Sequence, residues 1–364
     1  MTPPTSRRRF LTVVGLCSLG GIAGCTEDNN PAENSPGDAT GTPPSDTPTS
    51  TAEAQTADAS PSDTPTSTTE AQTTGASPSD YSPYSGTSEF LYDARNSGYN
   101  PDESGPTTSV ATSWTLSRST DMSTFPAVVD GTVFVGGYTG DFEALSATDG
   151  SQQWSFSTEN NSAFQSSPTV RDGTVYTGAD NGTFYALDAT SGEQIWSFET
   201  PDALQSAPAV VDNTAYTLGR FGSLTAIDID ERSELWSMET PGGDVGSPAV
   251  GEGSVFITDR RKTVHSFDAE TGEVNWTTTM SEVCRASPAV ANGVVYTGDD
   301  SGNVYAIDAE DGTTIWTQSF PNADVDHSPV VAGGSLYVGC TDGTIANLSQ
   351  SDGTEQWSVN LGEM

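Results

Sequence analysis

Short alternating apolar and polar stretches, separated by glycine turns, recur along the second part of the chain. In residues 287–320 three such stretches are followed by a fourth that carries Trp316. The turns between them, such as Asn292-Gly293, end in glycine, which suits two-residue hairpins because these turns need a positive φ angle. The pattern predicts four antiparallel strands per unit, at 288–290, 294–297, 304–307 and around Trp316.

Tryptophan marks a period of about 40 residues along the same region. The seven tryptophans are Trp114, Trp154, Trp196, Trp236, Trp276, Trp316 and Trp357. Six prolines each stand 28 residues before a tryptophan, at Pro126, Pro168, Pro208, Pro248, Pro288 and Pro329. A four-stranded unit of this length is typical of a β-propeller blade. We therefore predict an all-β fold in which blades stack around a ring, because a single blade leaves both of its apolar faces exposed.

The tryptophan segments also resemble a known repeat. Residues 186–196, Ala-Leu-Asp-Ala-Thr-Ser-Gly-Glu-Gln-Ile-Trp, are similar to the tryptophan-docking motif of pyrroloquinoline-quinone (PQQ)-like propeller repeats, and 306–316 match equally well. The resemblance covers about 270 residues. It implies that each tryptophan, at the start of an outer strand, packs against the neighbouring blade. Departures from the motif are Ser146 and Ser349 for the aspartate, Arg232 for the glycine, and Ser266 and Asn347 for the first alanine.

The number of blades does not follow directly from the number of tryptophans. Six complete proline-to-tryptophan units coexist with a seventh tryptophan at Trp114. We predict six full blades plus an extra N-terminal strand from residues 88–118, added at the outer edge, where it helps to close the ring. Seven blades, one of them incomplete, is the alternative.

The first 25 residues resemble an export signal. Arg7 and Arg8 stand before Phe-Leu, an apolar run follows, and Ile22-Ala-Gly-Cys25 ends the segment. This resembles a twin-arginine signal with a lipobox, in which Arg7 and Arg8 direct export and Cys25 carries the lipid. A transmembrane helix would need roughly 20 apolar residues, about twice what the run offers.

Residues 26–87 are rich in Ser, Thr and Pro and contain almost no apolar residues. Such a segment cannot bury enough surface to offset its ordering entropy, so we predict a disordered stalk. The expected organisation is a signal peptide at 1–24, a stalk at 25–87 and a propeller domain at 88–364.

The net charge of the chain bears on its source organism and on the partners it can bind. The chain has 50 acidic residues against 12 Lys and Arg, a formal net charge of −38. Molar salt shortens the Debye length to about 3 Å and removes most of the resulting self-repulsion, so we expect a halophilic, haloarchaeal protein. The same charge argues against nucleic-acid binding, which needs a clustered cationic face.

The resemblance to PQQ-like repeats suggests one functional hypothesis, that the chain is a quinoprotein dehydrogenase. Such enzymes hold PQQ and calcium with added acidic and amide ligands, and many carry an adjacent cysteine pair. No adjacent cysteines occur here, and the chain leaves no room for the insertions that build such a site. We therefore predict a non-catalytic protein with no cofactor and no metal site, with the PQQ-dependent enzyme as the alternative.

Other residues give no catalytic or metal-binding pattern. His265 and His327 fall in different parts of their repeats, so we predict structural roles for both. The acidic turn 299–302 is expected to be solvated surface, with weak calcium binding as the alternative.

Five cations gather in repeats three to five. They are Arg220, Arg260, Arg261, Lys262 and Arg285. In an antiparallel blade the first strand starts at the same end as the second hairpin, so all five should lie on one face. We hypothesise an anion-accepting patch, with Phe221 as apolar neighbour, for an acidic protein partner or a glycan. Local salt bridges to neighbouring acids are the alternative.

Cys284 and Cys340 should approach the same face in adjacent blades. A disulfide between them and two free thiols are therefore alternative predictions.

Together these features predict a monomeric, non-catalytic binding scaffold, anchored by lipid to the extracytoplasmic face of the cell membrane. Its architecture would resemble bacterial propeller lipoproteins of outer-membrane assembly. A haloarchaeon has no outer membrane, so their partner is not carried over.

Overall fold

The computed structural model describes residues 93, 96, 99–100, 112, 114–117, 122–243, 246–321 and 323–362. All the elements in this part of the chain are β-strands, which confirms the predicted all-β fold. The predicted signal peptide and stalk, with Arg7, Arg8 and Cys25, lie outside these residues. Within the same ranges no helix has the length and apolarity to cross a membrane.

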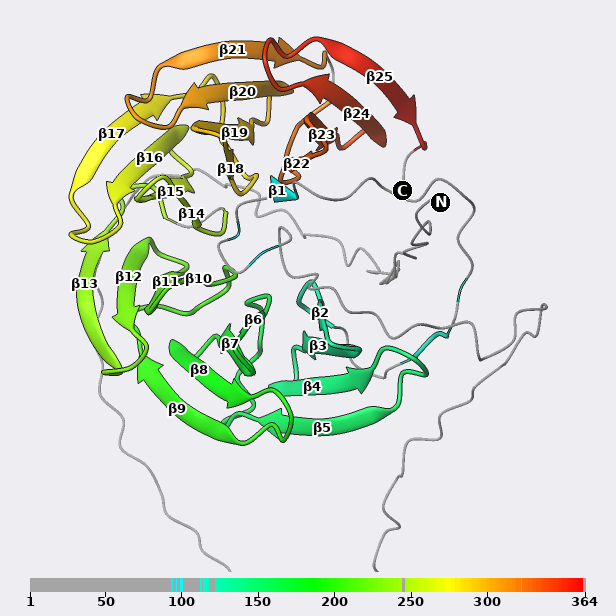
Figure 1. Ribbon diagram of the computed structural model, residues 1–364, viewed down its shortest axis with the longest axis vertical. Helices are drawn as coiled ribbons and strands as arrows, with labels where there is room; N and C mark the ends of the chain where they lie inside the picture. The colour runs from blue at the N-terminus through cyan, green and yellow to red at the C-terminus, as the bar shows by residue number, and fades with distance from the viewer. Residues whose placement is uncertain are drawn as a thin grey trace, which may run out of the picture. The chain divides into compact units, whose positions relative to one another are not determined.

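Six four-stranded antiparallel sheets follow one another in chain order around a common centre (Figure 1), and we number these blades 1 to 6. The innermost strands are β2 (Ala127–Val129), β6 (Thr169–Arg171), β10 (Ala209–Val211), β14 (Ala249–Gly251), β18 (Ala289–Ala291) and β22 (Val330–Ala332). The second strands are β3 (Thr132–Gly136), β7 (Thr174–Gly178), β11 (Thr214–Leu218), β15 (Ser254–Thr258), β19 (Val294–Gly298) and β23 (Ser335–Gly339). The third strands are β4 (Asp141–Ser146), β8 (Thr183–Asp188), β12 (Ser223–Asp228), β16 (Thr263–Asp268), β20 (Asn303–Asp308) and β24 (Thr344–Ser349). The outer strands are β5 (Gln152–Ser157), β9 (Gln194–Glu199), β13 (Ser233–Glu239), β17 (Val274–Thr279), β21 (Thr314–Ser319) and β25 (Glu355–Asn360).

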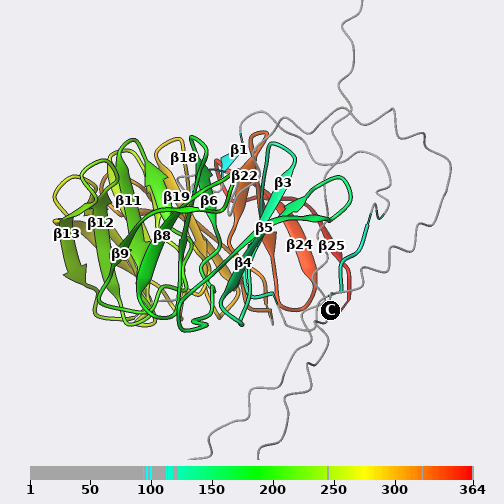
Figure 2. The ribbon, with the colours of Figure 1, turned by 90° about the horizontal axis from the view of Figure 1, so that it is seen from below.

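Each blade therefore contains the four strands that the repeat predicted, and the count of six blades is confirmed. The repeat prolines stand directly before the innermost strands, a position that needs no ladder hydrogen bond from the missing N–H. In side view the hairpin turns lie at the two ends of the strands (Figure 2).

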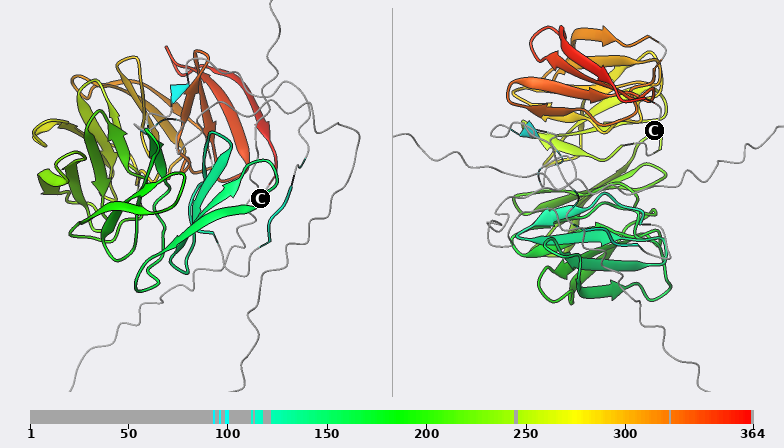
Figure 3. Two further views of the ribbon diagram at one scale, coloured as in Figure 1. Left: turned by 60° about the horizontal axis from the view of Figure 1, so that its bottom comes forward. Right: turned by 90° about the vertical axis from the view of Figure 1, so that its right-hand side faces the viewer.

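The extra N-terminal strand is present, but on the opposite edge from the expected one. β1 (Tyr99–Asn100) pairs in parallel with β22, the innermost strand of blade 6, and lies close to β18. Figures 1 and 3 show it in cyan at the inner end of that blade. Nearby, the buried Asn96 amide donates to the carbonyls of Ala207 and Pro248, at 3.1 Å each, just before the inner strands of blades 3 and 4. The segment thus caps unpaired backbone at the centre, whereas we expected it at the rim.

The apolar core lies between neighbouring blades. One buried cluster joins Phe256 and Val264 of blade 4 with Val295, Tyr305 and Ile307 of blade 5, and similar clusters join blades 1 and 2, 2 and 3, 3 and 4, and 5 and 6. The second and third strands are mostly buried, as in β15, where all five residues are buried, and β8, where five of six are. Blades 2 to 5 therefore have both of their faces covered by the neighbouring blades.

Five of the tryptophans dock on a following blade. The indole N–H donates to a carbonyl in the last hairpin of the following blade, at 2.8 to 3.2 Å. These bonds join Trp114 to Ala147, Trp154 to Ala189, Trp236 to Ala269, Trp276 to Ala309, and Trp316 to Gln350. Trp114 makes the same contact with blade 1 as an outer-strand tryptophan makes with its next blade.

Each of these indole rings stacks on a glycine with a positive φ angle. A Cβ atom built on the glycine would come within 2.5 to 2.8 Å of the ring. The glycines are Gly150, Gly192, Gly272, Gly312 and Gly353. Glycine is required at this position for two reasons. Its backbone is left-handed, and the indole ring occupies the space that a Cβ atom would need. Trp357 on β25 differs, since its side chain is 47% exposed.

A pair of glycine variants separates these two reasons. Gly312→Ala should destabilise by about 1–2 kcal/mol through its φ of +75° and by about 1–3 kcal/mol more through the clash with Trp276. Gly293 has the same φ but nothing within 4 Å of a built Cβ, so Gly293→Ala should show only the first penalty. Urea unfolding of both variants measures the difference. Equal losses would contradict the stacking role of the glycine.

Candidate functional site

The predicted cation patch falls on the second hairpins of blades 3 and 4 and on the loop before β18. Backbone hydrogen bonds show that such loops and hairpins share one end of a blade. The Arg220 N–H donates to the Ala203 carbonyl at 2.8 Å, and that of Asp300 donates to Val283 at 2.9 Å. We call this end of blades 3–5 the arginine face, defined by Arg220, Phe221, Arg260, Arg261, Lys262 and Arg285.

The hairpin between β11 and β12 presents an arginine and an aromatic ring together. The guanidinium carbon of Arg220 lies 5.9 Å from the centroid of the Phe221 ring, within the range of a cation–π contact. The Phe221 side chain is 69% exposed. The turn reaches this shape at Gly222, whose φ of +106° favours glycine. The result is an apolar, cationic tip that projects from blade 3.

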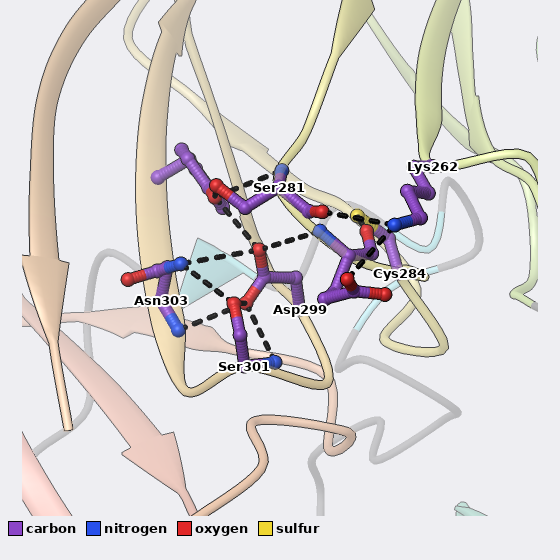
Figure 4. A network of polar contacts seen from close by, with 8 residues as sticks. Lys262, Ser281, Cys284, Asp299, Ser301 and Asn303 are labelled. Atoms are coloured by element: carbon purple, nitrogen blue, oxygen red, sulfur yellow. Dashed lines mark hydrogen bonds and ion pairs between the residues drawn. The ribbon is translucent and has the colours of Figure 1, made fainter. Parts of the chain in front are cut away.

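Lys262 and Arg285 are paired with acids in the structure. The Lys262 ammonium lies 2.8 Å from the Glu282 carboxylate and donates to the Ser281 carbonyl at 3.2 Å (Figure 4). Arg285 lies 3.0 Å from the carboxylate of Asp300. These pairs are partly exposed, so each contributes about 0–1 kcal/mol at most. The alternative of local salt bridges therefore describes Lys262 and Arg285.

A buried carboxylate organises the hairpin of blade 5. Asp299 is fully buried; one of its oxygens accepts the N–H groups of Ser301 and Asn303 at 3.0 Å, and the other accepts the Tyr305 hydroxyl at 2.7 Å (Figure 4). Burial alone would raise the pKa of Asp299, but the hydrogen bonds from Tyr305, Ser301 and Asn303 outweigh it and lower the pKa. The expectation of a solvated turn is therefore wrong for Asp299, because its carboxylate is used inside the blade.

The same arrangement occurs in blade 4, with a histidine in place of the tyrosine. Asp259 accepts the N–H groups of Arg261 and Thr263, at 2.8 and 3.0 Å, and lies 2.9 Å from His265 Nε2. Burial opposes ionisation here as well, yet the bonds from His265 and the two N–H groups lower the pKa of Asp259. The His265 ring also stacks on Phe267, at 5.7 Å between centroids, so the histidine is part of the packed blade. Asp259 holds the turn that presents Arg260 and Arg261.

Both cysteines of the propeller are free thiols, so the disulfide alternative is not the form seen. Cys284 belongs to the core cluster between blades 4 and 5, whereas Cys340 belongs to the cluster between blades 5 and 6. Burial, reinforced by Asp299, Asp259 and Asp300, raises the pKa of Cys284 well above its ordinary value. Burial raises that of Cys340 to about 11. Neither thiol is a nucleophile at neutral pH.

The described residues contain no ready-made acidic cluster for the calcium of a quinone centre. Calcium beside the quinone needs a cluster of oxygen ligands. Across the described ranges, no group of three or more His, Cys, Asp or Glu side chains converges as a metal site would require. We therefore derive no step through such a cofactor.

The fold and the tryptophan docking define a PQQ-like β-propeller. The sequence matches the family PQQ_2, described as outer membrane protein assembly factor BamB, over residues 107–230, 200–282 and 260–363. These matches span more than half of the chain, and the chain belongs to this family.

Among solved structures, a similar one is the crystal structure of BamB from Moraxella catarrhalis. It is 19% identical, with a TM-score of 0.56, over 67% of this chain and 75% of that one, a likeness that shows the fold alone. The fold is widespread, since 1633 solved chains match it, and so it does not by itself select a function. A search of curated proteins finds no match.

The buried aspartates make the stability of the propeller depend on pH. Because the pKa values of Asp259 and Asp299 are lowered in the folded state, their stabilisation is complete above about pH 4, the ordinary pKa of Asp. It is lost as the pH falls through the lowered values. Asp299→Asn should cost about 1–3 kcal/mol at pH 7 and weaken the pH dependence below pH 4.

Urea unfolding between pH 2 and 8 measures both effects. The matched control is Asp130→Asn, in an exposed turn, which should stay within about 0.5 kcal/mol of the wild type. An Asp299→Asn variant as stable as this control would contradict the structural role of the carboxylate.

Proposed function

We propose that this chain is a non-catalytic binding scaffold, anchored by a lipid on Cys25 at the extracytoplasmic face of the membrane. Its family is described by the name of an assembly factor, a protein whose work is done on other proteins. The leader residues Arg7, Arg8 and Cys25 support export and anchoring, because the two motifs occur together at the spacing of a twin-arginine lipoprotein signal.

The partner docks on the arginine face. The observation that carries this proposal is Phe221, which is 69% exposed and lies beside the Arg220 guanidinium. Exposed aromatic and arginine side chains dominate binding energy at protein interfaces, and here they occur on the same hairpin. Arg260 and Arg261 extend the cationic surface on the next blade. The partner is therefore an acidic protein segment or an acidic glycan that also covers an aromatic ring.

Charge reversal on this face tests the docking. Arg220→Glu with Arg260→Glu should remove the partner that co-purifies with wild-type protein from host membranes, because both substitutions turn attraction into repulsion. Asp130→Arg also reverses a charge, in an exposed turn at the opposite ends of the blades, and should leave the partner bound. Circular dichroism confirms that each variant is folded. If the double variant retains every wild-type partner, the arginine face is not the docking site.

The anchor has its own matched test. Cys25→Ser removes the residue that carries the lipid, and the protein should move from the membrane fraction to the soluble extracellular fraction. Cys17→Ser changes the other cysteine of the leader and should leave the protein in the membrane fraction. Immunoblots of the fractions measure both results. Membrane retention of the Cys25→Ser variant would refute a lipid on this residue.

A further inference from the structure

The contact between blades 2 and 3 departs from the docking pattern of the other seams. At five positions the indole ring of the preceding tryptophan stacks on a glycine. At the equivalent position in blade 3 the residue is Arg232, with a φ of +55°. The arginine carries a Cβ atom where the ring would lie, so Trp196 cannot occupy the place that Trp154 or Trp276 occupies on its own next blade.

The displaced tryptophan is left with an unused hydrogen-bond donor. By the pattern of the other seams, the indole N–H of Trp196 would donate to the Ile229 carbonyl. Among the described residues the indole bonds join five other tryptophans to their next blades, and Trp196 makes no such bond. The side chain is nonetheless only 8% exposed. An N–H that is not fully buried and has no protein partner is free to donate to a ligand or to water.

A pocket of about 330 Å³ opens beside this tryptophan. Its apolar lining includes Trp196, Tyr176 and Ile229, and its polar lining includes Arg232, Asp230 and Asn213. It lies at the ends of the blades that carry the first hairpins, opposite the arginine face. Pockets of this size hold small organic ligands.

We propose that this pocket binds a small polyhydroxylated ligand, a mono- or disaccharide. Its apolar part, the accessible edge of the Trp196 indole with Ile195 and Ile229, can contact the C–H groups of a sugar ring. Around it stand donors, the Trp196 N–H and the Arg232 guanidinium, next to an acceptor, the Asp230 carboxylate. Sugar hydroxyls donate and accept at once, so they satisfy both kinds of group. A ligand with a single charge would meet a like charge as well as an opposite one in this mixed lining.

This site is independent of the proposed docking face. The pocket and the arginine face lie at opposite ends of the blades, and neither needs the other to be occupied. Loss of partner binding and loss of saccharide binding are therefore separate results, measured with different variants.

Tryptophan fluorescence and calorimetry test the proposal on the full propeller. The probes are the methyl glycosides of glucose, mannose, galactose and N-acetylglucosamine, with maltose and cellobiose, each up to about 10 mM, tenfold above a weak dissociation constant of about 1 mM. At least one should bind saturably and change the fluorescence. Glutamate and lysine are the charged comparison ligands.

Arg232→Gly is the decisive variant because it restores the glycine of the other seams. The indole of Trp196 can then dock on blade 3, so saccharide affinity should fall at least tenfold while the melting temperature stays equal or rises. Trp196→Phe keeps a ring but removes the N–H, and it should also weaken binding. Trp276→Phe makes the same change at an ordinary seam and should leave binding unchanged.

Three results would overturn the proposal. They are the absence of binding by every saccharide probe, binding of only glutamate or lysine, and an affinity that is unchanged in both Arg232→Gly and Trp196→Phe.

Discussion

The propeller depends on one contact that is made again at each ordinary seam: an indole ring resting on a left-handed glycine of the next blade. The N–H of the same ring donates to a carbonyl in that hairpin, so orientation and distance are fixed together. A four-stranded sheet alone would leave both apolar faces in water, and the contact positions its neighbour to cover one of them. The angle between neighbouring blades is thus set by this contact between one tryptophan and one glycine hairpin.

A second constraint acts at the opposite ends of blades 4 and 5. Buried carboxylates, Asp259 and Asp299, gather the N–H groups of their hairpins and lower their own pKa values in doing so. The Asp259 hairpin carries Arg260, Arg261 and Lys262, and the Asp299 hairpin carries Asp300, which pairs with Arg285, so buried carboxylates position these exposed charges. In a chain with 50 acidic residues, these two carboxylates lie inside the blade, where they organise the backbone.

Much of this was predictable because the same local rules recur in every repeat. Tryptophan and proline spacing determined blade number, strand order and the placement of cations at one end of the blades. The location of β1 was missed, since a two-residue parallel strand has no periodic signal that records its partner. The burial of Asp299 was missed because it depends on Tyr305 and on a loop packed from outside the hairpin. Arg232 was visible as a departure, but its effect on Trp196 required the geometry of the seam.

The position of β1 has a consequence for the order of folding. Its partner β22 stands more than 230 residues later in the sequence, in the last blade to be synthesised. Contacts of such large sequence separation carry a high loop-closure cost and form slowly. Early blades can assemble by local pairing, whereas the β1 contact at the centre can form only after the strand of blade 6 that it pairs with has been synthesised.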